Sequence, residues 1–196
     1  LLEVLAQIKK PTSGRIEWTE TQRVSNTPRS GILFQHSALL LNLSIYENIA
    51  LPIRYFNPNI SDEILHSKIH KTLQQVGLDK HMDLYPEQLS GGMLKRAALA
   101  RTIANQPELI FYDEPFSGQD SIHCQRITAL IRQLNQKLQI TSILVTHEYL
   151  FSFDIADHVI VLGDKHIVAQ GTPKDILNHP HPLVHSLIHG SSRNAS

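Results

Sequence analysis

Several features that often reveal a protein's class are scarce or missing in this sequence of 196 residues. Cys124 is the single cysteine, so no disulfide can form within the chain, as is typical of proteins from the reducing cytosol. No uninterrupted apolar run reaches about 18 residues, so we expect no membrane-spanning helix. The 18 lysines and arginines balance 18 aspartates and glutamates, and this net charge of zero gives no overall basic field that would attract DNA or RNA.

The phosphate-binding motif Gly-x-x-x-x-Gly-Lys-[Ser/Thr] is also missing from the sequence. The chain starts on Leu1, which already belongs to an apolar helical pattern, with neither a capping residue nor an initiator methionine before it. No charged stretch followed by a cleavage site indicates a signal peptide. We therefore interpret the N-terminus as a helix that is cut at its beginning.

The order of the expected elements is typical of an α/β fold. Strands are predicted at 15–18, 31–34, 109–113 and 141–146, and a hairpin over 157–171 with its turn at Gly163-Asp164. The runs "LIFYD" at 109–113 and "TSILVT" at 141–146 show little alternation, which indicates strands buried on both faces. Helices are predicted at 1–8, 44–54, 61–76, from 91 onward and at 121–138. The sequence thus predicts a single domain over 1–196, with an α/β core from 1–35 and 106–196 and a helical insertion from 36–105.

Two acidic residues end the first of these apolar strands. Asp113 and Glu114 follow "LIFY", and in an open parallel sheet ligands lie beyond the carboxyl ends of the strands. There Asp113 could hold Mg²⁺, directly or through water, while Glu114 could orient and polarise a water that attacks a γ-phosphate. The alternative is an ordinary acidic turn after a strand.

The next strand, "ILVT", is followed by His147. Neighbouring parallel strands would place this histidine on the same edge as Asp113 and Glu114, where it could donate a hydrogen bond to a γ-phosphate or to the attacking water. The alternative is a histidine that only caps a turn.

The segment "LSGGM" has the features of an anion-binding helix start. Ser90 is a good N-cap residue, and the amides of Gly91 and Gly92 can approach an anion closely because no Cβ intervenes. The partial positive charge of the helix N-terminus adds to this. The alternative is an ordinary capping turn without a ligand.

Together these motifs resemble the ATP-binding-cassette (ABC) ATPase family, and the resemblance covers nearly the whole chain. "LSGGMLKRAALAR" resembles the family's signature motif, "LIFYDE" its Walker B strand, "SGQD" at 117–120 its D-loop, and "GILFQ" the segment that ends in its Q-loop glutamine, Gln35. His147 resembles the switch histidine. Several motifs in the right order and spacing are far more specific than any one of them.

The resemblance implies a P-loop NTPase (RecA-like) core with an inserted helical subdomain, and ATP and Mg²⁺ as cofactors. Glu114 and His147 would be the catalytic residues, and Asp113 and Gln35 the metal ligands. In this family two ATPase subunits form a head-to-tail dimer, so Ser90, Gly91 and Gly92 would hold the γ-phosphate of a nucleotide bound mainly to the partner chain. Gln35 and Asp120 would complete the list of nucleotide-binding residues.

The resemblance also implies that the first strands and the phosphate loop, which precede "LLEVLAQIKKPTSG" in the family, are absent here. We therefore expect a truncated chain that is inactive alone. The rival interpretation outside the transporter class is a catalytically inactive protein that acts only through interactions. The missing loop favours that rival, whereas the intact Glu114 and His147 argue against it.

The subgroup is indicated by "FQHSALL", by Met93 and by "DEPFSGQD", which resemble the ATPases of the Mla (maintenance of lipid asymmetry) phospholipid transporters. The implied partners are a membrane permease, a STAS-domain protein and an MCE-domain protein, with no nucleic acid, and the implied location is the cytoplasmic face of the bacterial inner membrane. The segment 44–54 is the expected docking face for the permease, although its apolar residues could instead form the subdomain core: Ile45, Ile49 and Leu51. An ABC ATPase for another substrate is the rival within the class.

Overall fold

The computed structural model describes residues 1–18 and 28–190 of the chain, without the side chains of residues 189 and 190. It divides into two compact units, Leu1–His147 and Glu148–Ser196.

A three-stranded parallel sheet is the centre of the first unit. Its strands are β1 (Ser30–Leu33), β2 (Leu109–Asp113) and β3 (Thr141–Val145), in the order β1-β2-β3, and the register pairs Ile32 with Phe111 and Phe111 with Ile143. The strands are parallel, so their carboxyl ends lie at one edge, which we call the carboxyl edge. β2 is buried from Leu109 to Tyr112, which confirms the prediction of a strand covered on both faces.

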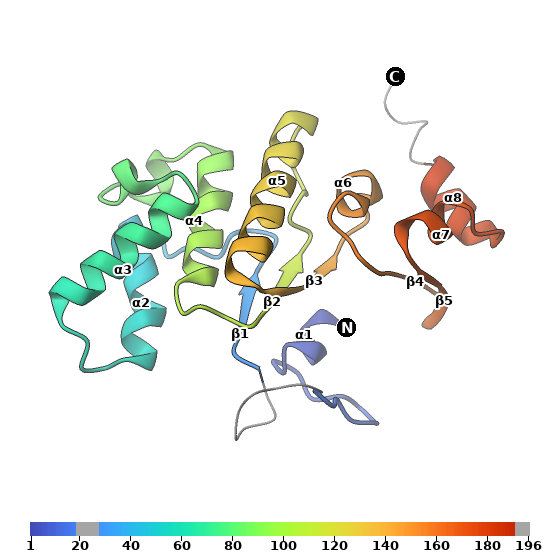
Figure 1. Ribbon diagram of the computed structural model, residues 1–196, viewed down its shortest axis with the longest axis horizontal. Helices are drawn as coiled ribbons and strands as arrows, with labels where there is room; N and C mark the ends of the chain where they lie inside the picture. The colour runs from blue at the N-terminus through green and yellow to red at the C-terminus, as the bar shows by residue number, and fades with distance from the viewer. Residues whose placement is uncertain (19–27, 191–196) are drawn as a thin grey trace. The chain divides into compact units, whose positions relative to one another are not determined.

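The helices between β1 and β2 form a packed group beside the sheet (Figure 1). They are α2 (Ile45–Phe56), α3 (Asp62–Gln75) and α4 (Gly91–Ile103), with 3₁₀ turns η1 (Asp79–His81) and η2 (Pro86–Gln88) before α4. Their N-caps are Ser44, Ser61 and Ser90, and each accepts a hydrogen bond from a backbone N–H in the first turn. The shared core contains fully buried side chains from all three helices: Ile45, Ile49, Ile53, Leu65, Ile69, Leu73, Ala97 and Ala100.

β1 packs closely on α4. A Cβ added at Gly31 would lie 2.8 Å from both Cγ2 and the carbonyl oxygen of Thr102, so this strand position requires glycine. The Thr102 hydroxyl donates to the carbonyl of Ile32 at 3.2 Å. The helical group is therefore joined firmly to the first strand of the sheet.

Helix α5 (Ser121–Leu138) connects β2 to β3 (Figure 1). Asp120 caps its N-terminus, and Gln139 ends it in the left-handed conformation at φ 52°. Its apolar side chains lie along one stripe, with Ile127, Ile131 and Leu134 buried and Leu130 and Leu138 half-buried.

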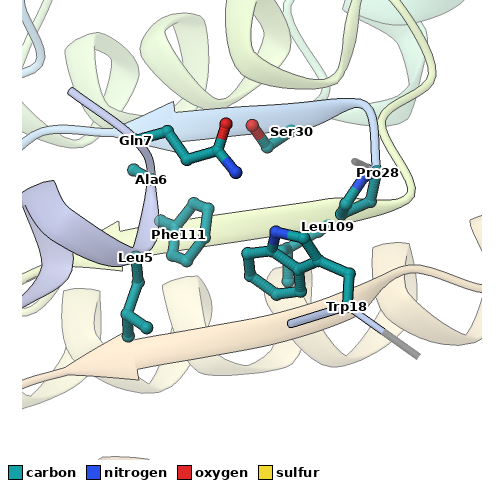
Figure 2. A pocket seen from close by; sticks show the side chains of 8 residues that line it. All are labelled: Leu5, Ala6, Gln7, Trp18, Pro28, Ser30, Leu109 and Phe111. Carbon is teal, nitrogen blue, oxygen red and sulfur yellow. The ribbon is translucent and has the colours of Figure 1, made fainter. Parts of the chain in front are cut away.

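The short helix α1 (Leu2–Leu5) packs against β2. Leu2 is buried with Leu109 and Phe111, and Trp18 packs edge-on against the Phe111 ring with ring centroids 6.5 Å apart. Figure 2 shows the small cavity here, which is lined by Leu5, Ala6, Gln7, Trp18, Pro28, Ser30, Leu109 and Phe111. Its volume of about 20 Å³ is too small for any ligand larger than water.

The second unit holds helix α6 (Tyr149–Phe153), the antiparallel hairpin β4 (Val159–Gly163) and β5 (His166–Gly171), and helices α7 (Pro173–Leu177) and α8 (Pro182–Gly190). Its core cluster is formed by Val161, Ala169, Ile176, Val184 and Ile188. The hydroxyl of Tyr149 donates to the carbonyl of Ile188, which ties α6 to α8.

Three sequence-based expectations need correction. Residues 15–18 form no strand, since they pair with no strand in the described part of the chain. β3 is exposed or half-buried along its length because, among the described strands, it pairs with β2 alone. The hairpin turns one residue later than predicted, at Asp164-Lys165, where φ values of 48° and 65° suit a type I′ turn.

Among the described helices, none combines the length and the apolar content needed to cross a bilayer.

Candidate active site

The carboxyl edge brings together the ends of the buried strand β2 and its neighbour β3. The register pairs Asp113 of β2 with Val145 of β3, and the next residues along each strand are Glu114 and Thr146. Glu114 has φ 47°, a left-handed conformation that is uncommon outside glycine, and its N–H donates to the carbonyl of Val145 at 2.9 Å. This turn directs the chain away from β2 at the point where the acidic pair lies, and such strain is frequent at functional sites.

Both carboxylate oxygens of Glu114 are held by residues that follow β3. Oε2 accepts a hydrogen bond from the hydroxyl of Thr146 at 3.0 Å, and Oε1 lies 3.0 Å from Nδ1 of His147. The side chain of Glu114 is only 20% exposed, whereas that of His147 is 70% exposed. A carboxylate fixed in this way, beside an accessible imidazole, can accept a proton from a water held at the edge.

Asp113 ends β2 as a half-buried carboxylate. Within the described residues it forms no hydrogen bond or ion pair through its side chain. Gln35 stands just past the end of β1, on the far side of β2 from β3, and its amide Nε2 donates to the hydroxyl of Ser117 at 3.1 Å. One carboxylate and one amide oxygen are ligands of the kind that Mg²⁺ takes together with phosphate oxygens and water, and metal binding by Asp113 and Gln35 stays a prediction.

The signature turn, Ser90, Gly91 and Gly92, begins α4 next to the start of α5. The hydroxyl of Ser90 accepts from the N–H of Met93 at 3.4 Å. A Cβ added at Gly92 would lie 3.0 Å from Cδ2 of His123, so the turn and the start of α5 are in close contact. The turn opens onto a groove of about 500 Å³ that is lined by side chains of both helices: Met93, Arg96, His123, Arg126, Ile127 and Leu130, with Val76.

Asp120 is held by His123 in the first turn of α5. Its Oδ1 accepts from the His123 N–H at 2.8 Å and its Oδ2 lies 2.8 Å from Nδ1 of the same residue. The backbone hydrogen bond, followed by the one from the imidazole, lowers the pKa of Asp120 below its ordinary value. The structure therefore gives Asp120 a capping role, and nucleotide binding through it stays a prediction.

The structure thus joins Glu114 to His147 and Gln35 to Ser117, while the signature turn lies beside Asp120 and His123. Sequence analysis missed Thr146, Ser117 and Lys95. Thr146 directly precedes His147 and Ser117 opens "SGQD", so both stand within motifs that were recognised. Lys95, whose ammonium donates to the backbone carbonyl of Gln35, has no signal in the sequence that separates it from other lysines on helices.

The family model described as ABC transporter matches residues 1–117, more than half of the chain. The chain belongs to the ABC transporter ATPase family. This confirms the sequence-based assignment, and the α/β fold of this ABC ATPase is that of the P-loop NTPases.

This ABC ATPase is similar to two transporter ATP-binding proteins and to one cassette of known structure. It is 41% identical, over 83% of its own length, to the intermembrane phospholipid transport system ATP-binding protein MlaF of Escherichia coli K12, and it spans 60% of that protein. It is 35% identical to the sulfate/thiosulfate import ATP-binding protein CysA of Vibrio vulnificus, over 98% of this chain and 58% of that protein. A dimeric ATP-binding cassette in a post-hydrolysis state, bound to ADP and Pi, has a TM-score of 0.74 and 26% identity, covering 88% of this chain and 78% of that one.

Proposed function

We propose that this chain belongs to the ATP-hydrolysing subunit of an ABC transporter that moves phospholipid across the cell envelope. The observation that carries the hydrolytic part is the Glu114 carboxylate, which Thr146 and His147 hold at the carboxyl edge of the sheet. Loss of turnover in Glu114→Gln tests this part of the proposal.

Each residue of the edge has one role in this proposal. Glu114 accepts a proton from the attacking water, and Thr146 keeps the carboxylate oriented for that step. His147 donates a hydrogen bond to the transferred phosphate as charge develops on it. Asp113 and Gln35 would hold Mg²⁺, which neutralises phosphate charge when it is bound.

The signature turn completes a nucleotide site in a head-to-tail dimer. Ser90, Gly91 and Gly92 present backbone N–H groups at the N-terminus of α4, where a phosphate of the partner's nucleotide is favoured by both the donors and the helix dipole. Support comes from the dimeric form of the similar cassette that holds ADP and Pi.

A mixed-dimer experiment tests this sharing of sites. Ser90→Arg fills the space for the partner's phosphate, and Glu114→Gln removes the base of its own chain. In a heterodimer of the two variants one site carries both lesions and the other carries none. We expect random mixing to recover up to about a quarter of wild-type turnover, because half of the dimers are mixed and each has one intact site of two.

Ser67→Arg is the matched control, since Ser67 is exposed on α3 and this change should leave turnover unaltered. Steady-state phosphate release by the complete gene product is the measurement, with heterodimers verified by two affinity tags. If verified heterodimers show no activity above either parent variant, the site is not shared between chains.

Permease docking is expected beside the start of α2. The structure places Ile45 and Ile49 in the core at 0% exposure, so these two do not form a docking face. Leu51 and Tyr55, one turn apart on α2, are exposed, as are Leu40 and Leu41 in the loop that precedes it. Leu40 and Leu41 follow Gln35 closely in the chain, so a membrane partner bound at these two residues would sense a movement of Gln35.

The proposed substrate is phospholipid and the proposed location is the cytoplasmic face of the bacterial inner membrane. Support comes from the 41% identity to the MlaF protein and from the motif positions Met93, Gly118 and Gln119. The 35% identity to a CysA protein favours the second candidate, an importer ATPase for another substrate. STAS-domain and MCE-domain proteins are the further partners proposed with the permease.

A copurification experiment distinguishes between the two candidate substrates. The complete gene product, expressed with its genomic neighbours and purified through a tag, should bring down a membrane permease and a STAS-domain protein, and mass spectrometry should find bound phospholipid only when the membrane parts are present. The ATPase purified alone is the control and should carry no lipid. A permease for an inorganic anion or an amino acid, without phospholipid, would keep the ATPase assignment and refute the lipid substrate.

A further inference from the structure

Lys95 is a buried cation whose hydrogen bond goes to a neutral backbone group. It lies on α4, only 7% exposed, and its Nζ donates to the carbonyl oxygen of Gln35 at 2.5 Å. Within the described part of the chain its ammonium forms no ion pair with a carboxylate. Burial lowers the pKa of Lys95 below its ordinary value. Burying an ammonium costs free energy, and an apolar side chain of similar length would fill the same space without this cost. The hydrogen bond to Gln35 is therefore the feature that lysine adds at this position.

The backbone carbonyl and the side-chain amide of Gln35 are each held by a different part of the first unit. Its backbone oxygen is held by α4, the helix that begins with the signature turn. Its side-chain amide donates to the hydroxyl of Ser117 at 3.1 Å, and the N–H of Ser117 donates to the carbonyl of Glu114 at 3.2 Å. A continuous series of hydrogen bonds thus leads from α4 through Gln35 to the backbone of Glu114.

The chain after Gln35 is fixed to the helices as well. Arg101 of α4 donates to the carbonyl of Ala38 at 2.7 Å, where Ser37 and Ala38 have φ values of 63° and 48°. The buried Asn48 of α2 donates to the carbonyl of Leu40 at 3.0 Å and accepts from its N–H at 2.8 Å. These contacts fix the loop beyond Gln35, whereas Lys95 alone among them acts on Gln35 itself.

We propose that Lys95 is a positioning residue: its buried ammonium fixes the carbonyl of Gln35 and so sets where the Gln35 amide lies relative to Ser117 and the Asp113-Glu114 pair. The proposal rests on the proposed ATPase function, and it makes α4 the element that places Gln35. A displacement of the signature helix is then transmitted to the Gln35 backbone through one side chain.

Steady-state ATPase kinetics of the complete gene product test this role. Lys95→Met keeps the length of the side chain and removes the donor. We expect kcat to fall roughly ten- to a hundredfold with a much smaller change in KM for ATP, because a reacting group is misplaced while the nucleotide is still bound. Lys95→Arg restores a cationic donor and should recover most of kcat. Lys71→Met, on the exposed face of α3, is the matched control and should equal the wild type.

A double-mutant cycle with Gln35→Ala separates positioning from a general loss of structure. If Lys95 acts through Gln35, Lys95→Met should cost nothing further in the Gln35→Ala background. Additive losses, a wild-type kcat in Lys95→Met, or an unrescued Lys95→Arg would each overturn the proposal. Melting temperatures verify folding, and if Lys95→Met does not fold, Lys95→Leu, which also lacks a donor, takes its place with the same expected pattern.

The wild type and Glu114→Gln are measured in parallel. Absence of turnover in the wild type refutes the proposed function and this inference together. Wild-type turnover that depends on Glu114 but not on Lys95 refutes the role of Lys95 alone.

Discussion

In the complete gene product, replacing Glu114 with glutamine should lower the rate of ATP hydrolysis by about 10²- to 10⁴-fold, the usual contribution of a general base. The amide has nearly the shape of the carboxylate, so the turn at φ 47° and the backbone hydrogen bond to Val145 should persist. Glutamine cannot accept the proton of the attacking water, so nucleotide binding should be retained while turnover is lost. The measurements are phosphate release at saturating ATP and titration with a fluorescent nucleotide.

Glu63→Gln is the matched control, since Glu63 is exposed in the first turn of α3, away from the sheet. It should leave both turnover and nucleotide binding unchanged. Wild-type turnover in Glu114→Gln would show that another group accepts the proton, and loss of binding would show that the carboxylate holds the nucleotide instead.

Removing the imidazole in His147→Ala should slow hydrolysis by about 10²-fold, the effect of deleting one preorganised donor to a transition state. It also removes the contact to Oε1 of Glu114, while the Thr146 hydroxyl still holds Oε2. The carboxylate is therefore expected to keep part of its orientation, which makes the loss smaller than in Glu114→Gln. Phosphate release across a range of ATP concentrations should show the change mainly in kcat.

His158→Ala provides the comparison, because His158 is exposed in the second unit and has no role in the proposal. The Thr146→Ala variant separates the two contacts to Glu114, and combining it with His147→Ala should bring turnover down to that of Glu114→Gln. If His147→Ala alone kept wild-type kcat, the histidine would only cap the end of β3.

Local signals in the sequence were sufficient to predict most helices. Ser44, Ser61 and Ser90 are good N-cap residues, and all three cap helices in the structure. The apolar run of β2 likewise predicted a strand buried on both faces. These features depend on residues within a few positions of one another.

The errors arose where pairing and neighbours decide the outcome. Residues 15–18 have strand-forming side chains, but a strand requires a hydrogen-bonded partner, and none lies beside them in the described part of the chain. The apolar run of β3 suggested full burial, yet its exposure depends on which strands and helices cover it. The composition of a segment does not encode these partners.

For the candidate site, motifs predicted which residues end the strands but not the contacts between them. The hydrogen bonds from Thr146 to Glu114, from Gln35 to Ser117 and from Lys95 to Gln35 each join positions more than 30 residues apart. Such contacts follow from the tertiary arrangement of parallel strands and α4. They became visible only with the fold, and Lys95 would have remained one helical lysine among several.

In the sequence, α2, α3 and α4 lie between β1 and β2, which are neighbours in the sheet. This order affects how the newly synthesised chain can fold. A ribosome adds about 5–20 residues per second, so β1 emerges seconds before β2, its hydrogen-bonded neighbour, has been synthesised. If the three helices pack on one another during this interval, they bring the ends of β1 and β2 together without the entropy cost of closing a long flexible loop. The helical group would then act as a folding template for the sheet, and substitutions that loosen its core would show first as slow maturation and aggregation of newly made protein.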